Sequence, residues 1–155
     1  MRNQDDQIKV VEAMAKREEM IGQIYTIFAK KFPEHKNFWT QIAKEEDEHA
    51  RLLRTITINI MEGSLSLTEE RFEKERLAYS MDYIQDRLAS AENVEGNMTD
   101  ALKIALDIED SLVEKGFLKI FKGDAPRLKE ILNSLILATE VHRERIRAIL
   151  AKGKI

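Results

Sequence analysis

Apolar residues recur at spacings of three and four positions along four long segments of the chain. This spacing places side chains on one face of an α-helix, so that each segment has an apolar stripe. The stripes predict helices over residues 5–32, 34–62, 99–122 and 124–152. Pro33 separates the first two helices, because a proline disfavours helix in the residue before it, and Gly123 ends the third.

The segment between the second and third helices, residues 63–98, predicts a long and partly helical crossover. Ser80 divides it into two helical pieces, one that ends at Tyr79 and one over residues 81–91. We expect these pieces to cover an edge of the bundle. The predicted fold is therefore a single all-α domain over residues 1–155, with two antiparallel helical hairpins joined by a long crossover in a four-helix bundle.

Each predicted helix has polar residues within its apolar stripe, near its middle. They are Glu18 in the first helix, Glu46 and His49 in the second, Glu109 in the third, and Thr139 and His142 in the fourth. The neighbouring Arg17 and Glu19 fall outside the stripe and predict a solvated face. Carboxylates and imidazoles inside an apolar core are costly unless a partner satisfies them, and a metal ion is such a partner.

The combination of these side chains is more specific than any one of them. Glu46 and His49 lie three positions apart and project from the same face of a helix, but one such pair is expected by chance in so acidic a chain. Bundle-core dimetal sites take one Glu from each of two helices and a Glu-x-x-His pair from each of the other two. Carboxylate and imidazole ligands suit iron or manganese, and zinc can compete for them.

Other interpretations remain open at single positions. Glu18 and Glu109 could pair with a basic residue, although no Lys or Arg occupies the stripes near them. His142 could be a core histidine with its own hydrogen bonds, and Tyr25, on the same helical face as Glu18, could simply pack in the core.

Composition narrows the class of protein further. The net charge of −3 argues against nucleic acid as a partner, and 0 Cys excludes disulfides, thiol catalysis and Cys-ligated metals. No apolar run is long enough to span a membrane, and the residues after Met1 do not form the apolar core of a signal peptide. We therefore expect a cytoplasmic protein without a membrane or nucleic-acid partner.

The sequence resembles the rubrerythrin branch of the ferritin-like di-iron carboxylate family. Residues 18–29 are similar to the first ligand helix of that branch, and residues 43–50, which include Glu45 and Glu46, are similar to the second. The crossover and residues 105–109 also fit, so the resemblance covers nearly the whole chain. It implies a ferritin-like four-helix bundle with two bound iron ions, and manganese or zinc as alternatives.

The resemblance also implies roles for individual residues. Glu18 and Glu109 would be terminal carboxylate ligands, Glu46 would bridge two metals, and His49 and His142 would each bind one. Tyr25 would orient a ligand through its hydroxyl group. The implied activity is that of an oxidoreductase, a peroxidase or oxidase, that acts on peroxide or dioxygen with electrons from an external redox protein. The resemblance further implies a homodimer.

Thr139 departs from the family pattern, which requires Glu at this position. Glu140 is adjacent, but one step along a helix turns a side chain by about 100°. The site is therefore one bridging carboxylate short. This leaves open one metal ion in place of two, a non-catalytic iron-binding or iron-handling bundle, and a structural bundle that has lost its metal. With 0 Cys the chain also lacks the Cys-ligated iron domain of rubrerythrins, so redox activity needs an external electron donor.

Overall fold

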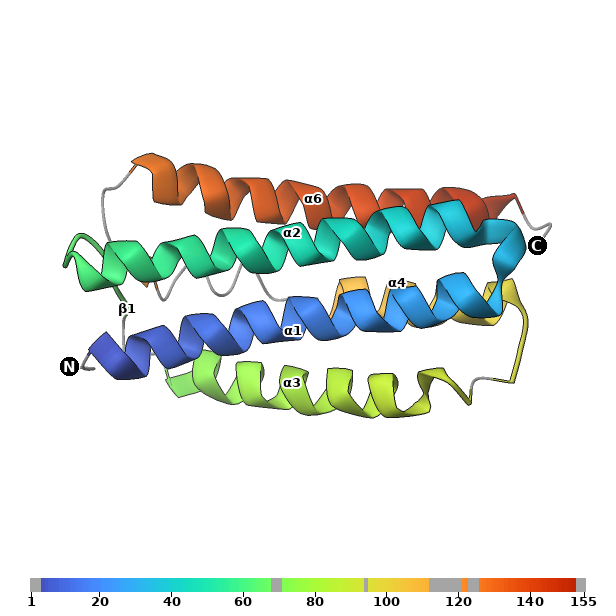
Figure 1. Cartoon of the computed structure of the whole chain (residues 1–155), viewed down its shortest axis with the longest axis horizontal. Helices are drawn as coiled ribbons and strands as arrows, with labels where there is room; N and C mark the ends of the chain where they lie inside the picture. Colours follow the sequence, from blue (N-terminus) through green and yellow to red (C-terminus); the bar gives the residue numbers. More distant parts are fainter. Residues whose placement is uncertain (1–3, 68–70, 94, 112–120, 123–125, 153–155) are drawn as a thin grey trace.

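The chain forms a helical bundle in a computed structural model (Figure 1). The structure describes residues 4–67, 71–93, 95–111, 121–122 and 126–152. The described helices are α1 (Gln4–Lys31), the short 3-10 helix η1 (Pro33–His35), α2 (Lys36–Met61), α3 (Arg71–Ala91), α4 (Met98–Asp110) and α6 (Pro126–Ala151). Two short strands, β1 (Ser66–Leu67) and β2 (Phe121–Lys122), pair antiparallel with each other.

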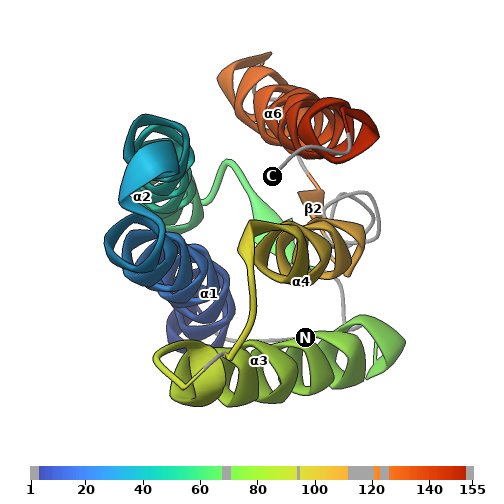
Figure 2. The same ribbon diagram turned by 90° about the vertical axis from the view of Figure 1, so that its right-hand side faces the viewer.

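The long helices run side by side, and each runs opposite to the one before it in the order α1, α2, α3, α4 and α6 (Figure 1). α1 packs along α2 and against α3, while α4 packs against α6. The end-on view shows α1 and α2 on one side of the bundle, with α4 between α3 and α6 on the other (Figure 2). Residues far apart in the sequence, on α1, α2, α4 and α6, therefore face a common interior.

The α1–α2 hairpin agrees with the helix ends that the sequence predicts. Its helices begin and end close to the predicted ranges, and Pro33 opens the 3-10 turn between them. Gly63, just after the end of α2, has a φ of 79°, a left-handed conformation that glycine adopts without steric cost. Gly63 therefore lets the chain turn away from the helix axis into β1.

The crossover differs from the prediction, because α3 is one continuous helix from Arg71 to Ala91. Ser80 does not cap a second helical piece. It is buried in the middle of α3, where its Oγ accepts a hydrogen bond of 2.6 Å from Nε of Arg17 on α1. A tertiary hydrogen bond thus uses the hydroxyl group that could otherwise have capped a helix.

The prediction of one continuous helix over residues 99–122 is wrong, because α4 ends at Asp110 and the predicted last residues, Phe121 and Lys122, are strand residues. The hydroxyl of Ser111 donates to the Ile108 carbonyl at 2.6 Å, which occupies a carbonyl of the last turn. Further along, Phe121 and Lys122 are strand residues opposite Leu67 and Ser66. The predicted apolar positions between residues 112 and 120 lie outside the described residues, as do Gly123 and Asp124.

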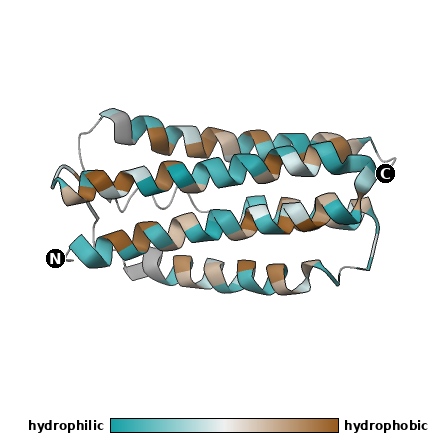
Figure 3. Ribbon diagram, viewed as in Figure 1, coloured by the Kyte–Doolittle hydropathy of each residue, from teal (hydrophilic) through white to brown (hydrophobic). Residues whose placement is uncertain are grey.

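The buried apolar side chains form two core clusters along the bundle. The first core cluster contains Val11, Met14, Ala15, Ala50, Leu53, Ile56, Ile60, Leu65, Leu77, Ile131, Leu132 and Leu135. The second core cluster includes Met20, Ile21, Ile24, Tyr25, Phe28, Trp39, Ile42, Ala43, Ile84, Leu102, Ala105, Ile108 and Ile146. Apolar and polar residues alternate accordingly along α1 and α2 (Figure 3). Among the described residues, no helix is long and apolar enough to cross a membrane.

Candidate metal centre

A layer of buried polar side chains lies between the two core clusters. Along α1, the first core cluster ends at Ala15 and the second begins at Met20, and Glu18 lies between them. Glu46 and His49 occupy the corresponding gap on α2. Apolar layers on both sides restrict the access of water to these groups. Their electrostatic interactions are therefore stronger than they would be at the surface.

Glu46 is the central residue of this layer, and its side chain is fully buried. Its two carboxylate oxygens face different histidines. Oε2 lies 3.3 Å from Nδ1 of His49 on α2, and Oε1 lies 3.0 Å from Nδ1 of His142 on α6. The two imidazole rings stack with centroids 5.6 Å apart. Glu46 is thus placed between two histidines as a carboxylate that bridges two metal ions would be.

Glu46 belongs to two groups of potential ligands. The first group consists of Glu18, Glu46 and His49, and the second of Glu46, Glu109 and His142. Within each group, one ligand atom per residue lies within 4.8 Å of the others, and all five side chains are buried. The structure therefore brings together all five residues that the sequence indicated as candidate ligands.

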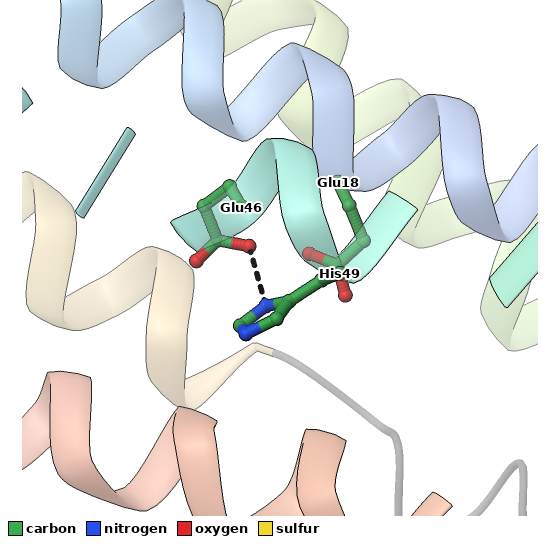
Figure 4. Close-up of side chains that lie close together, drawn as sticks. All are labelled: Glu18, Glu46 and His49. Atoms are coloured by element: carbon green, nitrogen blue, oxygen red, sulfur yellow. Dashed lines mark hydrogen bonds and ion pairs between the residues drawn. The ribbon is translucent and has the colours of Figure 1, made fainter. Parts of the chain in front are cut away.

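In the first group, the carboxylate of Glu18 on α1 points toward the side chains of Glu46 and His49 on α2 (Figure 4). Oε2 of Glu18 is buried and has no hydrogen-bond partner among the described residues. A buried carboxylate oxygen without a donor is costly, and a metal ion in this group would satisfy it.

In the second group, Glu109 on α4 approaches His142. Its Oε1 lies 3.4 Å from Nδ1 of His142 and accepts a hydrogen bond of 2.8 Å from the hydroxyl of Tyr25. Oε2 of Glu109, like Oε2 of Glu18, is buried without a hydrogen-bond partner in the described part of the chain. Each group thus offers a carboxylate oxygen with no hydrogen bond, and in this respect both groups fit a metal ion.

The pKa values of these groups are shifted by burial and by their mutual charges. Burial and the neighbouring Glu46 charge raise the pKa of Glu18 to about 8. Burial and the charge of Glu109 likewise raise the pKa of Glu46. Burial alone would lower the pKa of His142, but hydrogen bonds to Glu109 and Glu46 and their charges raise it to about 11. Without a metal, Glu18 and His142 therefore hold protons at neutral pH.

Glu45 is a residue of the site that the sequence did not indicate. Its Oε1 accepts a hydrogen bond of 2.9 Å from Nε2 of His142, on the opposite side of the ring from Glu46. Nη1 of Arg145 and Nε2 of Gln41 donate to the same carboxylate, at 3.0 Å and 2.7 Å. Burial opposes the ionisation of Glu45, but these hydrogen bonds hold its pKa below the ordinary value. Glu45 fixes the orientation of His142 with Nδ1 toward the site.

Arg17 does not lie on a solvated face, contrary to the prediction. Its side chain is buried, because α1 packs against α3 as well as against α2. The charge of Arg17 lowers the pKa of the adjacent Glu18, although burial and Glu46 outweigh it. By contrast, Glu19 is only half-buried and pairs with Arg54 of α2 at 2.8 Å.

Thr139 lies on the same face of α6 as His142, one turn before it, and is buried. Its hydroxyl donates a hydrogen bond of 3.0 Å to the backbone carbonyl of Leu135 in its own helix. Glu140 is half-buried and belongs to neither group of potential ligands. The second group therefore has three candidate ligands, and position 139 adds no carboxylate to it.

A surface pocket of about 670 Å³ lies beside α3 and α4. The described residues that line it are Glu75, Arg76, Tyr79, Ser80, Tyr83, Asp107, Asp110 and Ser111. None of the five candidate ligands is among these lining residues. We therefore assign the candidate chemistry to the buried layer rather than to the pocket.

Comparison with protein-family models, with curated proteins and with solved structures finds no match to this chain. The geometry of the buried layer is therefore the basis from which a function is inferred.

Proposed function

We propose that this chain is a rubrerythrin-like member of the ferritin-like proteins that binds iron, or manganese, in the layer around Glu46. It would act as an oxidoreductase on peroxide or dioxygen, with an external redox protein as electron donor. Two antiparallel helix pairs, α1–α2 and α4–α6, support the ferritin-like assignment, because such bundles carry their metal ligands on facing helices.

The position of Glu46 between the two histidines carries this proposal. One carboxylate that serves two ligand groups is the arrangement that two metal ions need if they share a bridging ligand. A core that needed Glu46 only for packing would gain nothing from burying four further ionisable groups around it. The three carboxylates and two imidazoles are ligands that suit iron and manganese.

Bound iron would supply electrons one at a time to the oxidant. The protein would supply the surroundings: Glu18, Glu46, His49, Glu109 and His142 would hold the metal, and the apolar clusters would limit the access of water. The Tyr25 hydroxyl would hold the Glu109 carboxylate in place through Oε1. Glu45 would hold the imidazole of His142 from its outer side.

Metal stoichiometry tests this proposal most directly. Protein prepared without added zinc and loaded with Fe(II) under anaerobic conditions should bind between about one and two iron ions per chain. Peroxide consumption is then measured with an artificial electron donor. Binding of less than about one iron ion per chain would contradict the proposal, as would iron-loaded protein that consumes no peroxide with any donor.

Two variants of α2 distinguish iron bound at the candidate metal centre from iron bound elsewhere. Glu46→Gln should reduce iron binding in both groups, because both share this carboxylate. Glu48→Gln changes an exposed carboxylate two positions away and should bind iron as the unchanged protein does. Equal losses in both variants would indicate non-specific binding to acidic surface residues.

Thr139 favours a second candidate function, a non-catalytic iron-binding or iron-handling bundle. Since its hydroxyl donates to the Leu135 carbonyl and position 139 supplies no carboxylate, the second group would hold its metal more weakly. Bound iron without peroxide turnover would support this candidate, and measurable turnover would exclude it.

A further inference from the structure

The pocket between α3 and α4 is the right size for a small molecule. Its volume of about 670 Å³ lies within the range of small-molecule sites, which is about 300–1,000 Å³. Tyr79 and Tyr83 line it from α3, and Asp107 and Asp110 line it from α4. Since none of the five candidate metal ligands is among its described lining residues, a ligand of this pocket would be distinct from the metal.

The α3 wall of the pocket carries aromatic rings. Tyr79 and Tyr83 are four positions apart, so they lie on one face of the helix. The guanidinium of Arg87 lies 5.2 Å from the centroid of the Tyr83 ring, an arrangement in which the ring attracts a cation. Tyr79 is 76% exposed and makes no ring contact or hydrogen bond with another described residue. The Tyr79 ring is therefore available to a cation from outside the protein.

The other charged groups of the pocket are mostly acidic. Three carboxylates, those of Glu75, Asp107 and Asp110, and one guanidinium, that of Arg76, are among the described lining groups. Asp110 forms an ion pair of 2.9 Å with Nε of Arg143 on α6. The exposed carboxylate of Asp107 has no hydrogen bond or ion pair with another described residue. Asp107 thus leaves a negative charge that attracts a cation and repels an anion.

The two hydroxyl groups that line the pocket already take part in hydrogen bonds within the protein. Oγ of Ser80 accepts from Nε of Arg17 at 2.6 Å, and the hydroxyl of Ser111 donates to the Ile108 carbonyl at 2.6 Å. A neutral ligand would have to compete with these bonds for polar contacts. Charge and aromatic surface are therefore the features by which this pocket would select its ligand.

We propose that the α3–α4 pocket binds a small organic cation, an amine that carries an aromatic group. The aromatic group lies against the rings of Tyr79 and Tyr83, and the ammonium group lies near the carboxylate of Asp107. Binding is reversible and makes no covalent bond. It requires no metal ion, so it goes beyond the proposed function and can be tested on metal-free protein.

Three probes of similar size and different charge test this proposal: phenethylamine, which is a cation at neutral pH, neutral phenethyl alcohol and anionic phenylacetate. Each is titrated into the metal-free protein, and the amide resonances are followed by NMR. Phenethylamine should bind with a Kd of about 1 mM or less. The alcohol should bind about tenfold more weakly, since it lacks the cation–π contact and the ion pair. Absence of phenethylamine binding, or binding of the alcohol or the acid that is at least as tight, would overturn the proposal.

Variants of two exposed residues locate the bound amine. Tyr79→Ala should weaken phenethylamine binding by about fivefold, whereas Tyr79→Phe keeps the ring and should retain the affinity. Asp107→Asn should weaken binding of the amine and leave that of the alcohol unchanged. Asp86→Asn is the control, because Asp86 is an exposed carboxylate of α3 that is not among the described lining residues.

The melting temperature of each variant shows whether its fold is intact. If Tyr79→Ala and Asp107→Asn bind phenethylamine as tightly as the unchanged protein does, the amine binds elsewhere and the proposal is wrong. Equal losses in Asp107→Asn and Asp86→Asn would also contradict it, because they would indicate a general effect of surface charge. Since these titrations use metal-free protein, a failure to bind iron would count against the proposed function alone.

Discussion

Glu45 and His142, which are 97 residues apart in sequence, are joined by a hydrogen bond of 2.9 Å between Oε1 and Nε2. The bond determines which ring nitrogen of His142 faces the candidate metal centre. With Nε2 held by Glu45, Nδ1 lies 3.0 Å from Glu46 and 3.4 Å from Glu109. Glu45 itself is held by Arg145 at the edge of the bundle, so a charged pair at the surface orients a fully buried candidate ligand.

Replacing Glu45 should therefore weaken the second ligand group and leave the first unchanged. In Glu45→Ala, Nε2 of His142 loses its partner, and loss of such a partner lowers metal affinity by about 10–100-fold. Glu45→Gln keeps one oxygen that can accept from Nε2 and should recover part of the loss. Calorimetric titration with Mn(II) measures the metal affinities of the two ligand groups separately.

Glu48→Ala is the matched control for these variants, because Glu48 is an exposed carboxylate on the same helix. It should bind metal as the unchanged protein does. If Glu45→Ala and Glu48→Ala have the same affinity for the second metal ion, Glu45 does not position His142.

Thr139→Glu should increase the affinity of the second ligand group for metal. The new carboxylate lies one helical turn from His142 on the same face and would complete the Glu-x-x-His pattern. We expect the second metal ion to bind at least about tenfold more tightly, which corresponds to about 1.4 kcal/mol. The larger side chain should also cost the metal-free protein about 1–3 kcal/mol of stability, since position 139 is buried.

Thr139→Val is the control, because it removes the hydroxyl without adding a carboxylate. The hydroxyl is engaged by the Leu135 carbonyl, so its loss should leave metal affinity unchanged. If Thr139→Glu does not change the affinity for the second metal ion, position 139 does not face the metal.

The apolar stripes explain why the candidate ligands could be predicted from the sequence. The apolar residues of each stripe are spaced three and four positions apart, and Glu18, Glu46 and His142 occupy positions of that spacing. A helix therefore places each of these side chains in the core, wherever the helix begins and ends. The period does not depend on tertiary contacts. The same rule would not have found Glu45, which lies outside the stripe of α2 and contacts His142 only because α6 packs nearby.

The features that sequence reasoning missed depend on contacts between distant segments. Serine is a residue type that often caps helices. In the structure, however, the Ser80 hydroxyl lies inside the continuous helix α3 and accepts a hydrogen bond from Arg17, which is 63 residues earlier in the chain. Phe121 falls inside the predicted helix over residues 99–122, but it pairs with Leu67 in a strand. A local pattern cannot predict either partner. The one local signal for the orientation of Glu45 is Gln41, four positions earlier. Residues at this spacing are neighbours on a helix, and Gln41 donates a hydrogen bond to Glu45.

Metal binding should release protons, and their number should identify the groups that are occupied. At pH 7 the pKa of about 8 for Glu18 and of about 11 for His142 mean that both carry a proton in the metal-free protein. Glu46, whose pKa is raised to about 7, holds part of a further proton. Ligands must lose their protons, so loading of both groups should release about two to three protons per chain. Because fewer protons remain to be displaced as the pH rises, metal affinity should increase with pH.

Calorimetry of Mn(II) binding in two buffers with different protonation enthalpies measures this number. In Glu18→Gln the release should fall by about one proton, as it should in His142→Gln. Proton release near zero in the unchanged protein would mean that neither group is protonated before metal binds.

The N-terminus of α4 should contribute to stability without contributing to metal binding. Oδ1 of Asn97 accepts from the backbone N–H of Asp100 at 3.1 Å, and Oδ2 of Asp100 accepts from the backbone N–H of Asn97 at 3.1 Å. Loss of such a cap costs about 1 kcal/mol, so Asn97→Ala should lower the free energy of unfolding by about that amount in a urea titration.

The position of Glu109 should not change when the Asn97 cap is removed. Leu102, Ala105 and Ile108 are fully buried in the second core cluster and hold the following turns of α4 in place. Metal stoichiometry should therefore be unchanged in Asn97→Ala. Asn93→Ala, at an exposed turn after α3, is the control and should change stability by less than about 0.5 kcal/mol. If Asn97→Ala instead reduces the number of bound metal ions, the cap rather than the core positions Glu109.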